Sequence, residues 1–238
     1  ILGNICTRRC RFCAVKHGHP EPINLDEPHA VAVTAGKLNL KHVVITTVTR
    51  DDLPDGGAGQ FVATINELHK ELPEATIEVL ISDLKGQSEP LVEIMQAGPD
   101  IINHNIETVP RLYKAVRPQA NYERSLKILK WISLWSKGIV SKSGLMLGLG
   151  ETFEEIVDVL NDLRKADCNI VTLGQYLSPS PRHLPVKRYV HPDEFKKLEQ
   201  IGLEMGFFAV SAGPLVRSSY NASHIYKGFS EKKNKEEK

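Results

Sequence analysis

The sequence predicts an α/β protein in which parallel strands alternate with helices in a partial (β/α)6 barrel. Short runs rich in Val, Ile and Thr alternate with longer amphipathic segments along the 238 residues, a pattern typical of strands joined by helical crossovers. The short runs lack strict polar–apolar alternation, which indicates strands buried on both faces. About six strand–helix units are present, short of the eight of a closed barrel. A doubly wound open sheet is the alternative.

Each expected element is recognised by its composition or its apolar spacing. Apolar residues recur at helical intervals in the segments 61–72, 126–134 and 156–163. The segments expected to form strands are 1–5, 43–48, 76–81, 101–106, 143–149, 170–177 and 207–211.

Composition excludes several classes of protein. The 30 Lys and Arg nearly balance the 29 Asp and Glu, giving a net charge of +1, so the general basic excess of a nucleic-acid-binding protein is missing. No apolar run approaches the roughly 20 residues of a membrane helix, and four cysteines are too few for a disulfide scaffold. We expect a single domain over residues 1–229 and a disordered, charged tail over 230–238. The Pro-rich segment 178–185 is expected to be a functional loop.

Three of the four cysteines lie close together in a C-x3-C-x2-C motif, at Cys6, Cys10 and Cys13. Three thiolates on one loop suit zinc or an iron–sulfur cluster. Structural zinc normally takes four protein ligands, and only His17 and His19 are local candidates for the fourth. A four-iron cluster on three cysteines would leave one iron open to a small molecule. Three arginines between the cysteines would offset the negative charge of a cluster: Arg8, Arg9 and Arg11.

The cysteine motif resembles that of the radical S-adenosylmethionine (SAM) superfamily, whose members have a partial (β/α)6 barrel. Further motifs make the chain similar to the lipoyl synthase family, and the similarity runs from Leu2 to about Gly228. An Arg-Asp-Asp-Leu and an Arg-Ser-Ser-Tyr sequence are among them. The matching segments are 2–15, 50–58, 103–109, 142–151, 174–177 and 213–220.

This resemblance implies an enzyme that inserts sulfur at carbons six and eight of an octanoyl chain. The octanoyl group is amide-linked to a lysine of a lipoyl carrier domain or the glycine-cleavage H protein, and a flavodoxin or ferredoxin supplies electrons. The implied cofactors are a 4Fe–4S cluster with SAM and a second, auxiliary 4Fe–4S cluster that donates sulfur. A biotin-synthase-like sulfur-inserting enzyme and a non-catalytic metal-binding remnant are the alternatives.

Five residues are candidates for binding SAM, because the active site of a β/α barrel forms at the carboxyl ends of the strands. Thr47 resembles the superfamily position that contacts the methionine amine. Asn105 and Glu107 share one side of a strand and suit the ribose or the methionine group. Lys142 or the nearby backbone is expected to reach the carboxylate, and the segment 148–150, which begins at Gly148, to let the adenine approach the backbone. A capping or supporting role is the alternative for each.

The auxiliary cluster of the family is held by three cysteines of an N-terminal C-x4-C-x5-C motif and by one serine of Arg-Ser-Ser-Tyr. The resemblance assigns that role to Ser219, with Ser218 as the alternative; a helix N-cap is the non-functional interpretation. The N-terminal motif is absent from the sequence, and Cys168 is expected to be a buried, inert thiol. We therefore expect either a fragment of a complete enzyme or a chain that has lost the sulfur step. The expected location is the cytoplasm, or an organelle in a eukaryote.

Overall fold

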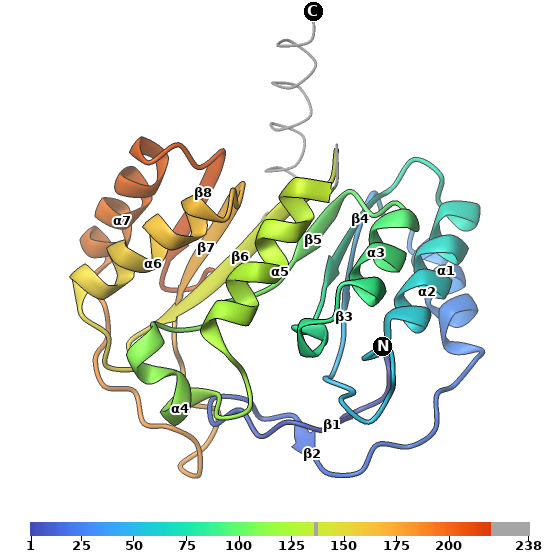
Figure 1. Ribbon diagram of the computed structural model, residues 1–238, viewed down its shortest axis with the longest axis horizontal. Coiled ribbons are helices and arrows are strands. Elements are labelled where there is room, and N and C mark those ends of the chain that lie inside the picture. The colour runs from blue at the N-terminus through green and yellow to red at the C-terminus, as the bar shows by residue number, and fades with distance from the viewer. Residues whose placement is uncertain (136–137, 220–238) are drawn as a thin grey trace, which may run out of the picture.

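The structure, a computed structural model, describes residues 1–135 and 138–219. Its centre is a six-stranded parallel sheet whose spatial order, β3-β4-β5-β6-β7-β8, is also the order in the chain (Figure 1). A doubly wound sheet would reverse direction at a switch point, so that alternative is wrong. The strands are β3 (His42–Thr46), β4 (Thr76–Leu80), β5 (Ile101–Asn103), β6 (Val140–Leu147), β7 (Ile170–Gln175) and β8 (Ala209–Gly213).

Helices connect consecutive strands and flank the sheet in chain order (Figure 1). Their starts follow from local sequence: Thr152 and Glu155 form a capping box before α6, and α1, α3 and α7 have proline in the first turn, where its missing N–H costs nothing. The main helices are α1 (Glu27–Lys37), α2 (Ala58–Glu71), α3 (Glu89–Gln96), α5 (Tyr122–Trp135), α6 (Phe153–Lys165) and α7 (Pro192–Glu204). Short helical turns are η1 (Leu84–Gly86), η2 (Pro110–Leu112) and α4 (Tyr113–Val116).

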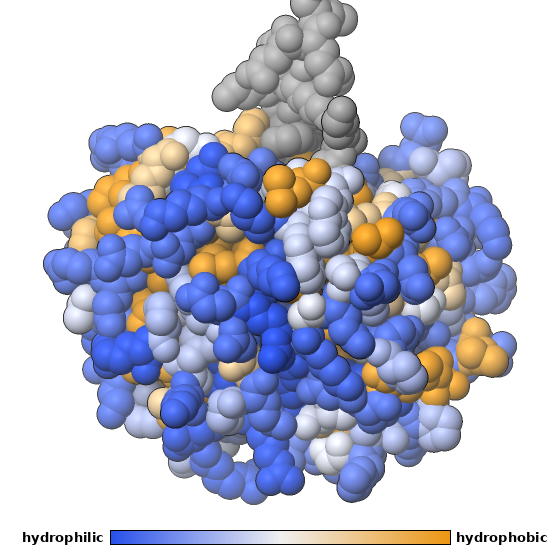
Figure 2. All heavy atoms as spheres, viewed as in Figure 1, coloured by the Kyte–Doolittle hydropathy of each residue, from blue (hydrophilic) through white to orange (hydrophobic). Residues whose placement is uncertain are grey.

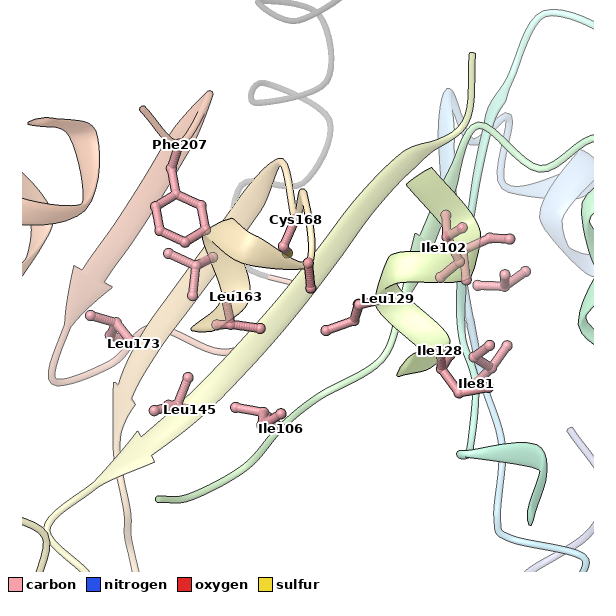
Figure 3. Packing of buried hydrophobic residues seen from close by; sticks show 14 of the residues in the cluster. Ile81, Ile102, Ile106, Ile128, Leu129, Leu145, Leu163, Cys168, Leu173 and Phe207 are labelled. Carbon is pink, nitrogen blue, oxygen red and sulfur yellow. The ribbon is translucent and has the colours of Figure 1, made fainter. Parts of the chain in front are cut away.

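The core lies between the helices and the sheet. Ile128 and Leu129 of α5 and Leu163 of α6 are fully buried, and Figure 3 shows them beside the apolar side chains of the strands. Burying each such side chain stabilises the fold by about 1.5–3 kcal/mol. The three helices expected from apolar spacing are confirmed, although Leu134 at the end of the second is 61% exposed.

The helix-covered face is mostly hydrophilic, with scattered apolar atoms (Figure 2). Among the described helices, none combines the length and the apolar character needed to span a membrane.

The prediction that residues 1–5 form a strand of the main sheet is wrong. Leu2 has φ +70° and Gly3 φ +84°, in the left-handed region that interrupts an extended strand. Only β1 (Ile5–Cys6) remains, paired with β2 (Lys16–His17). The sixth strand of the sheet is instead β8, close to the expected 207–211.

Candidate functional site

The three clustered cysteines lie on a loop at the carboxyl ends of the strands. Cys6 ends β1, and Cys10 and Cys13 lie in the turn that follows. The backbone N–H of Thr7 donates to the carbonyl of Thr49, just beyond β3, at 3.0 Å, and the Thr7 hydroxyl donates to the same oxygen at 2.9 Å. These bonds fix the cysteine loop over the end of the sheet.

The thiols have an environment that fits a shared cluster. All three are free and half-buried. The sulfur of Cys6 accepts two backbone N–H groups, at 3.3 and 3.4 Å, and that of Cys13 accepts one at 3.4 Å; such bonds stabilise thiolates. Burial raises the pKa of Cys13 and raises that of Cys10 to about 11, so ligation must displace protons. Within residues 1–135 and 138–219, no three His, Cys, Asp or Glu side chains are placed to hold a single metal ion.

The guanidinium of Arg8 is paired with two carboxylates, contrary to the expectation that it offsets cluster charge. Its guanidinium donates to Asp51 at 2.7 and 2.9 Å and to Asp83 at 2.5 Å. The residue is 5% exposed, so two carboxylates neutralise its charge inside the protein. Arg8 therefore ties the cysteine loop to the segments that follow β3 and β4.

A cavity of about 770 Å³ opens beneath the cysteine loop. Its walls come from the residues directly after β3, β4 and β5, so the cavity lies at the carboxyl ends of the strands, where the site is expected. Three of the five candidate SAM-binding residues line it together with the cysteines: Thr47, Asn105 and Glu107.

Asn105 and Glu107 present polar groups without full protein partners. The Asn105 Oδ1 is buried and accepts no hydrogen bond from the described residues. Glu107 has φ +67° and is held there by backbone bonds to Gly144 and from Met146, both 2.9 Å. Burial raises the pKa of the Glu107 carboxyl, opposed by the charge of Arg117. Strained backbone and unpaired polar atoms are typical of a site that awaits a ligand.

Thr47 follows β3 and lines the same cavity. Its hydroxyl donates to the carbonyl of Val48 at 2.8 Å, which leaves oxygen lone pairs to accept a hydrogen bond. An ammonium group, which only donates, is a suitable ligand for this oxygen. Its expected contact with the methionine amine stays a prediction.

The structure does not bring Lys142 to the cavity. The residue is 1% exposed, and its Nζ lies 2.9 and 3.1 Å from the two carboxylate oxygens of Glu78. It is the third residue of β6 and therefore lies near the amino end, away from the cysteines. This placement contradicts the expectation that Lys142 reaches the SAM carboxylate.

Gly148 also lies outside the cavity lining. It has φ +102°, and a Cβ there would lie 2.3 Å from the Gln175 Nε2 and 2.5 Å from the Arg188 carbonyl. Its N–H donates to the Glu151 carboxylate at 2.5 Å. Close packing of the loops after β6 and β7 thus requires glycine here, for a reason other than ligand approach.

A second, smaller cavity of about 190 Å³ shares Asn105 and Glu107 with the first. Ser218 lines it, whereas Ser219 is exposed and does not. The choice between the two serines as a ligand stays a prediction. The charged tail expected over 230–238 lies outside the described residues.

Cys168 is fully buried, and burial raises the pKa of its thiol to about 12. Its sulfur lies 3.3 Å from the Ile170 carbonyl, far from the cysteine loop in sequence and on the helix-packed side of the sheet (Figure 3). The expectation of a buried thiol is confirmed.

Sequence reasoning missed several cavity residues, among them Arg117 and His183. Arg117 donates to the Asn105 carbonyl at 2.9 Å, but it follows a four-residue helix and no pattern marks it. His183 lies 3.1 Å from the Cys13 carbonyl, within the Pro-rich loop that was expected to be functional. That loop therefore closes one side of the cavity.

Known proteins that are similar to this chain belong to the superfamily that its cysteine motif indicates. The Radical SAM superfamily model matches residues 1–163. The lipoyl synthase of Caldanaerobacter subterraneus subsp. tengcongensis is 56% identical over 222 residues, covering 93% of this chain and 78% of that protein. The lipoyl synthase of Rubrobacter xylanophilus is 53% identical, covering 93% and 69%. The fold resembles the crystal structure of methylornithine synthase, with a TM-score of 0.60 and 14% identity over 92% of this chain and 71% of that one. The chain belongs to the lipoyl synthase family of the radical SAM superfamily.

Proposed function

We propose that this enzyme inserts sulfur at carbons six and eight of an octanoyl group on a lysine of a carrier domain. The observation that carries the proposal is a single cavity of about 770 Å³. Three thiols face it from one side, and the polar groups that follow β3 and β5 face it from the other. A small polar molecule held there lies against both sets of groups.

Cys6, Cys10 and Cys13 would hold a 4Fe–4S cluster. With SAM bound, that cluster would supply an electron for the reductive cleavage of SAM, the chemistry that would allow hydrogen to be removed from the octanoyl chain. The protein's own contribution is orientation: Thr47 accepts from the ammonium group, and Asn105 and Glu107 bind the remaining polar groups of SAM. Arg8 keeps the cysteine loop in place through its two carboxylates.

The sulfur source is proposed to be an auxiliary 4Fe–4S cluster with a serine ligand. Ser219 is the residue that the family motif favours, and the placement of Ser218 in the second cavity supports the alternative. Cys168 supplies no ligand because it is buried elsewhere.

The proposed substrate is an octanoylated lipoyl carrier domain or the glycine-cleavage H protein. A flavodoxin or ferredoxin is the proposed electron donor, and the cytoplasm the proposed location. These proposals rest on membership of the family.

Anaerobic reconstitution tests the cluster. We expect about four irons on the cysteine triad, an electron resonance signal that shifts when SAM is added, and release of 5′-deoxyadenosine with reductant. Changing Cys6, Cys10 and Cys13 to Ala should abolish all three results, whereas Cys168→Ala, the matched control, should retain them. Zinc as the sole tightly bound metal would contradict the proposal.

A further inference from the structure

The rim of the larger cavity carries four exposed cations. Arg9, Arg11 and Lys16 come from the cysteine loop and β2, and Arg182 comes from the loop after β7. These two segments lie at the same edge of the molecule (Figure 1), and the N–H of Leu184 donates to the Arg11 carbonyl at 3.2 Å. We call these four residues the basic rim.

No rim residue forms an ion pair with a carboxylate of residues 1–135 or 138–219. Some exposed cations elsewhere on the surface do have such partners, for example Arg111 with Glu155 at 2.7 Å and Lys165 with Asp162 at 3.0 Å. Among the described residues, the one carboxylate in the cavity lining is Glu107, which lies inside beside Asn105. The rim is therefore a local concentration of positive charge on a chain whose net charge is only +1.

Uncompensated like charges repel one another and reduce the stability of the fold, so the rim favours a partner of opposite charge. Arginine is enriched in protein interfaces, and complementary charge speeds association and sets orientation. Val15, 43% exposed, also lines the cavity and adds apolar surface to the rim. A nucleic acid fits less well, because its backbone selects a broader basic surface.

We propose that the basic rim docks an acidic surface of the folded carrier protein around its octanoyl-lysine. This inference rests on the proposed function, because the modified side chain has to pass the rim to enter the cavity. The rim then recognises the carrier surface, while the cavity recognises the acyl chain. Binding depends on carboxylates that flank the modified lysine.

Charge reversal tests the docking site by a binding measurement that needs no turnover. The probe is a fluorescently labelled octanoylated lipoyl domain with acidic residues around its lysine, titrated anaerobically with the cluster-loaded enzyme. Lys16→Glu with Arg182→Glu should weaken binding about tenfold or more. Raising salt from about 50 to 300 mM should weaken the wild type in the same direction, because exposed charges are screened.

The matched control is Lys37→Glu with Lys41→Glu. It makes the same change in net charge near the amino end of β3, at the end of the strands opposite the cysteine loop, and should leave binding within about twofold. A carrier whose flanking carboxylates are changed to amides should bind the wild type weakly and lose little more in the rim variant.

Equal weakening in both charge-reversed proteins, or binding insensitive to salt, would overturn the docking proposal. So would tight binding of a DNA or RNA oligonucleotide that competes with the carrier. Release of 5′-deoxyadenosine, measured in parallel, distinguishes the two proposals. If the wild type releases 5′-deoxyadenosine but the rim variant binds the carrier normally, only the docking proposal is wrong. If the wild type releases none, the proposed function is wrong.

Discussion

Two clusters of polar side chains lie at different positions along the strands. The lower group is nearer the amino ends and the upper group nearer the carboxyl ends, and their carboxylates are paired to different extents. The lower one joins β4, β5 and β6: the Glu78 carboxylate accepts from Lys142 at 2.9 and 3.1 Å and from the Asn103 amide at 3.3 Å. Burial acts to raise the pKa of Glu78, but His42 and Lys142 outweigh it and hold that pKa below its usual range. The lower group therefore contains a buried ion pair between Glu78 and Lys142.

The upper group, Asn105 and Glu107, lies toward the cysteines. There burial prevails and raises the pKa of Glu107, and the Asn105 Oδ1 has no partner among the described residues. A buried polar group without a partner costs about 1–3 kcal/mol, which a bound ligand can recover. The Asn103 Oδ1 of the lower group also has no partner among the described residues, so an unpaired atom alone does not mark a binding surface. The comparison teaches that polar residues in one sheet divide into a structural cross-link and a binding surface according to whether the buried carboxylate is paired with a cation and whether the group opens into the cavity.

Lys142→Met should have the largest effect on stability. It leaves the Glu78 charge buried without its cation, which costs about 3–5 kcal/mol in the free energy of unfolding, measured by anaerobic urea denaturation. Lys130→Met is the control: Lys130 lies 4.0 Å from Asp167 in an exposed pair, worth about 1 kcal/mol or less. If Lys142→Met instead left stability intact and weakened SAM binding, the lower group would belong to the site.

Asn105→Ala and Glu107→Ala should affect ligand binding. Each removes a hydrogen bond to SAM worth about 1.5–3 kcal/mol where a charge takes part, so affinity should fall at least about tenfold. Equilibrium binding with the iron content measured in the same samples checks this, since the cluster should be unchanged. Asn103→Ala, the matched change in the lower group, should reduce stability and spare affinity; unchanged affinity in both upper variants would assign them a structural role.

Much of this arrangement could be predicted from sequence, and the failures have a physical cause. Spacing of the cysteines and apolar periodicity require only local order, so the cysteine loop, six of the seven expected strands and the three expected helices were predicted correctly. The helices α1, α3 and α7 were not predicted. The motif 142–151 was interpreted as one site segment, yet Lys142 begins it and Leu147 ends the strand. At about 3.3 Å per residue these positions lie roughly 16 Å apart, and depth along a strand decides which side chain reaches the cavity.

Other features depend on backbone angles or on contacts between distant segments. Leu2 adopts a left-handed φ, which the apolar character of residues 1–5 conceals. Arg117 enters the cavity from a short helix by bonding to the Asn105 carbonyl. The unpaired state of the basic rim likewise depends on where every carboxylate lies, and a motif contains no such information.

The smallest expected effect concerns pH. As the pH changes, the contributions of Glu78 and Glu107 to the free energy of unfolding should change in opposite directions. The lowered pKa of Glu78 means that its contribution to stability is present above the unfolded value of about 4.3 and is lost as pH falls through the folded value. The raised pKa of Glu107 means that ionisation opposes folding, and this cost disappears as pH falls. Glu107→Gln should therefore stabilise the protein near neutral pH, with the gain shrinking toward about pH 4. Glu78→Gln should be destabilising near neutral pH, and its loss should shrink only as the pH falls below about 4.3. Urea denaturation of both variants and the wild type, from neutral pH to below about pH 4, measures the two slopes, and slopes of the same sign would show that Glu107 is paired as Glu78 is.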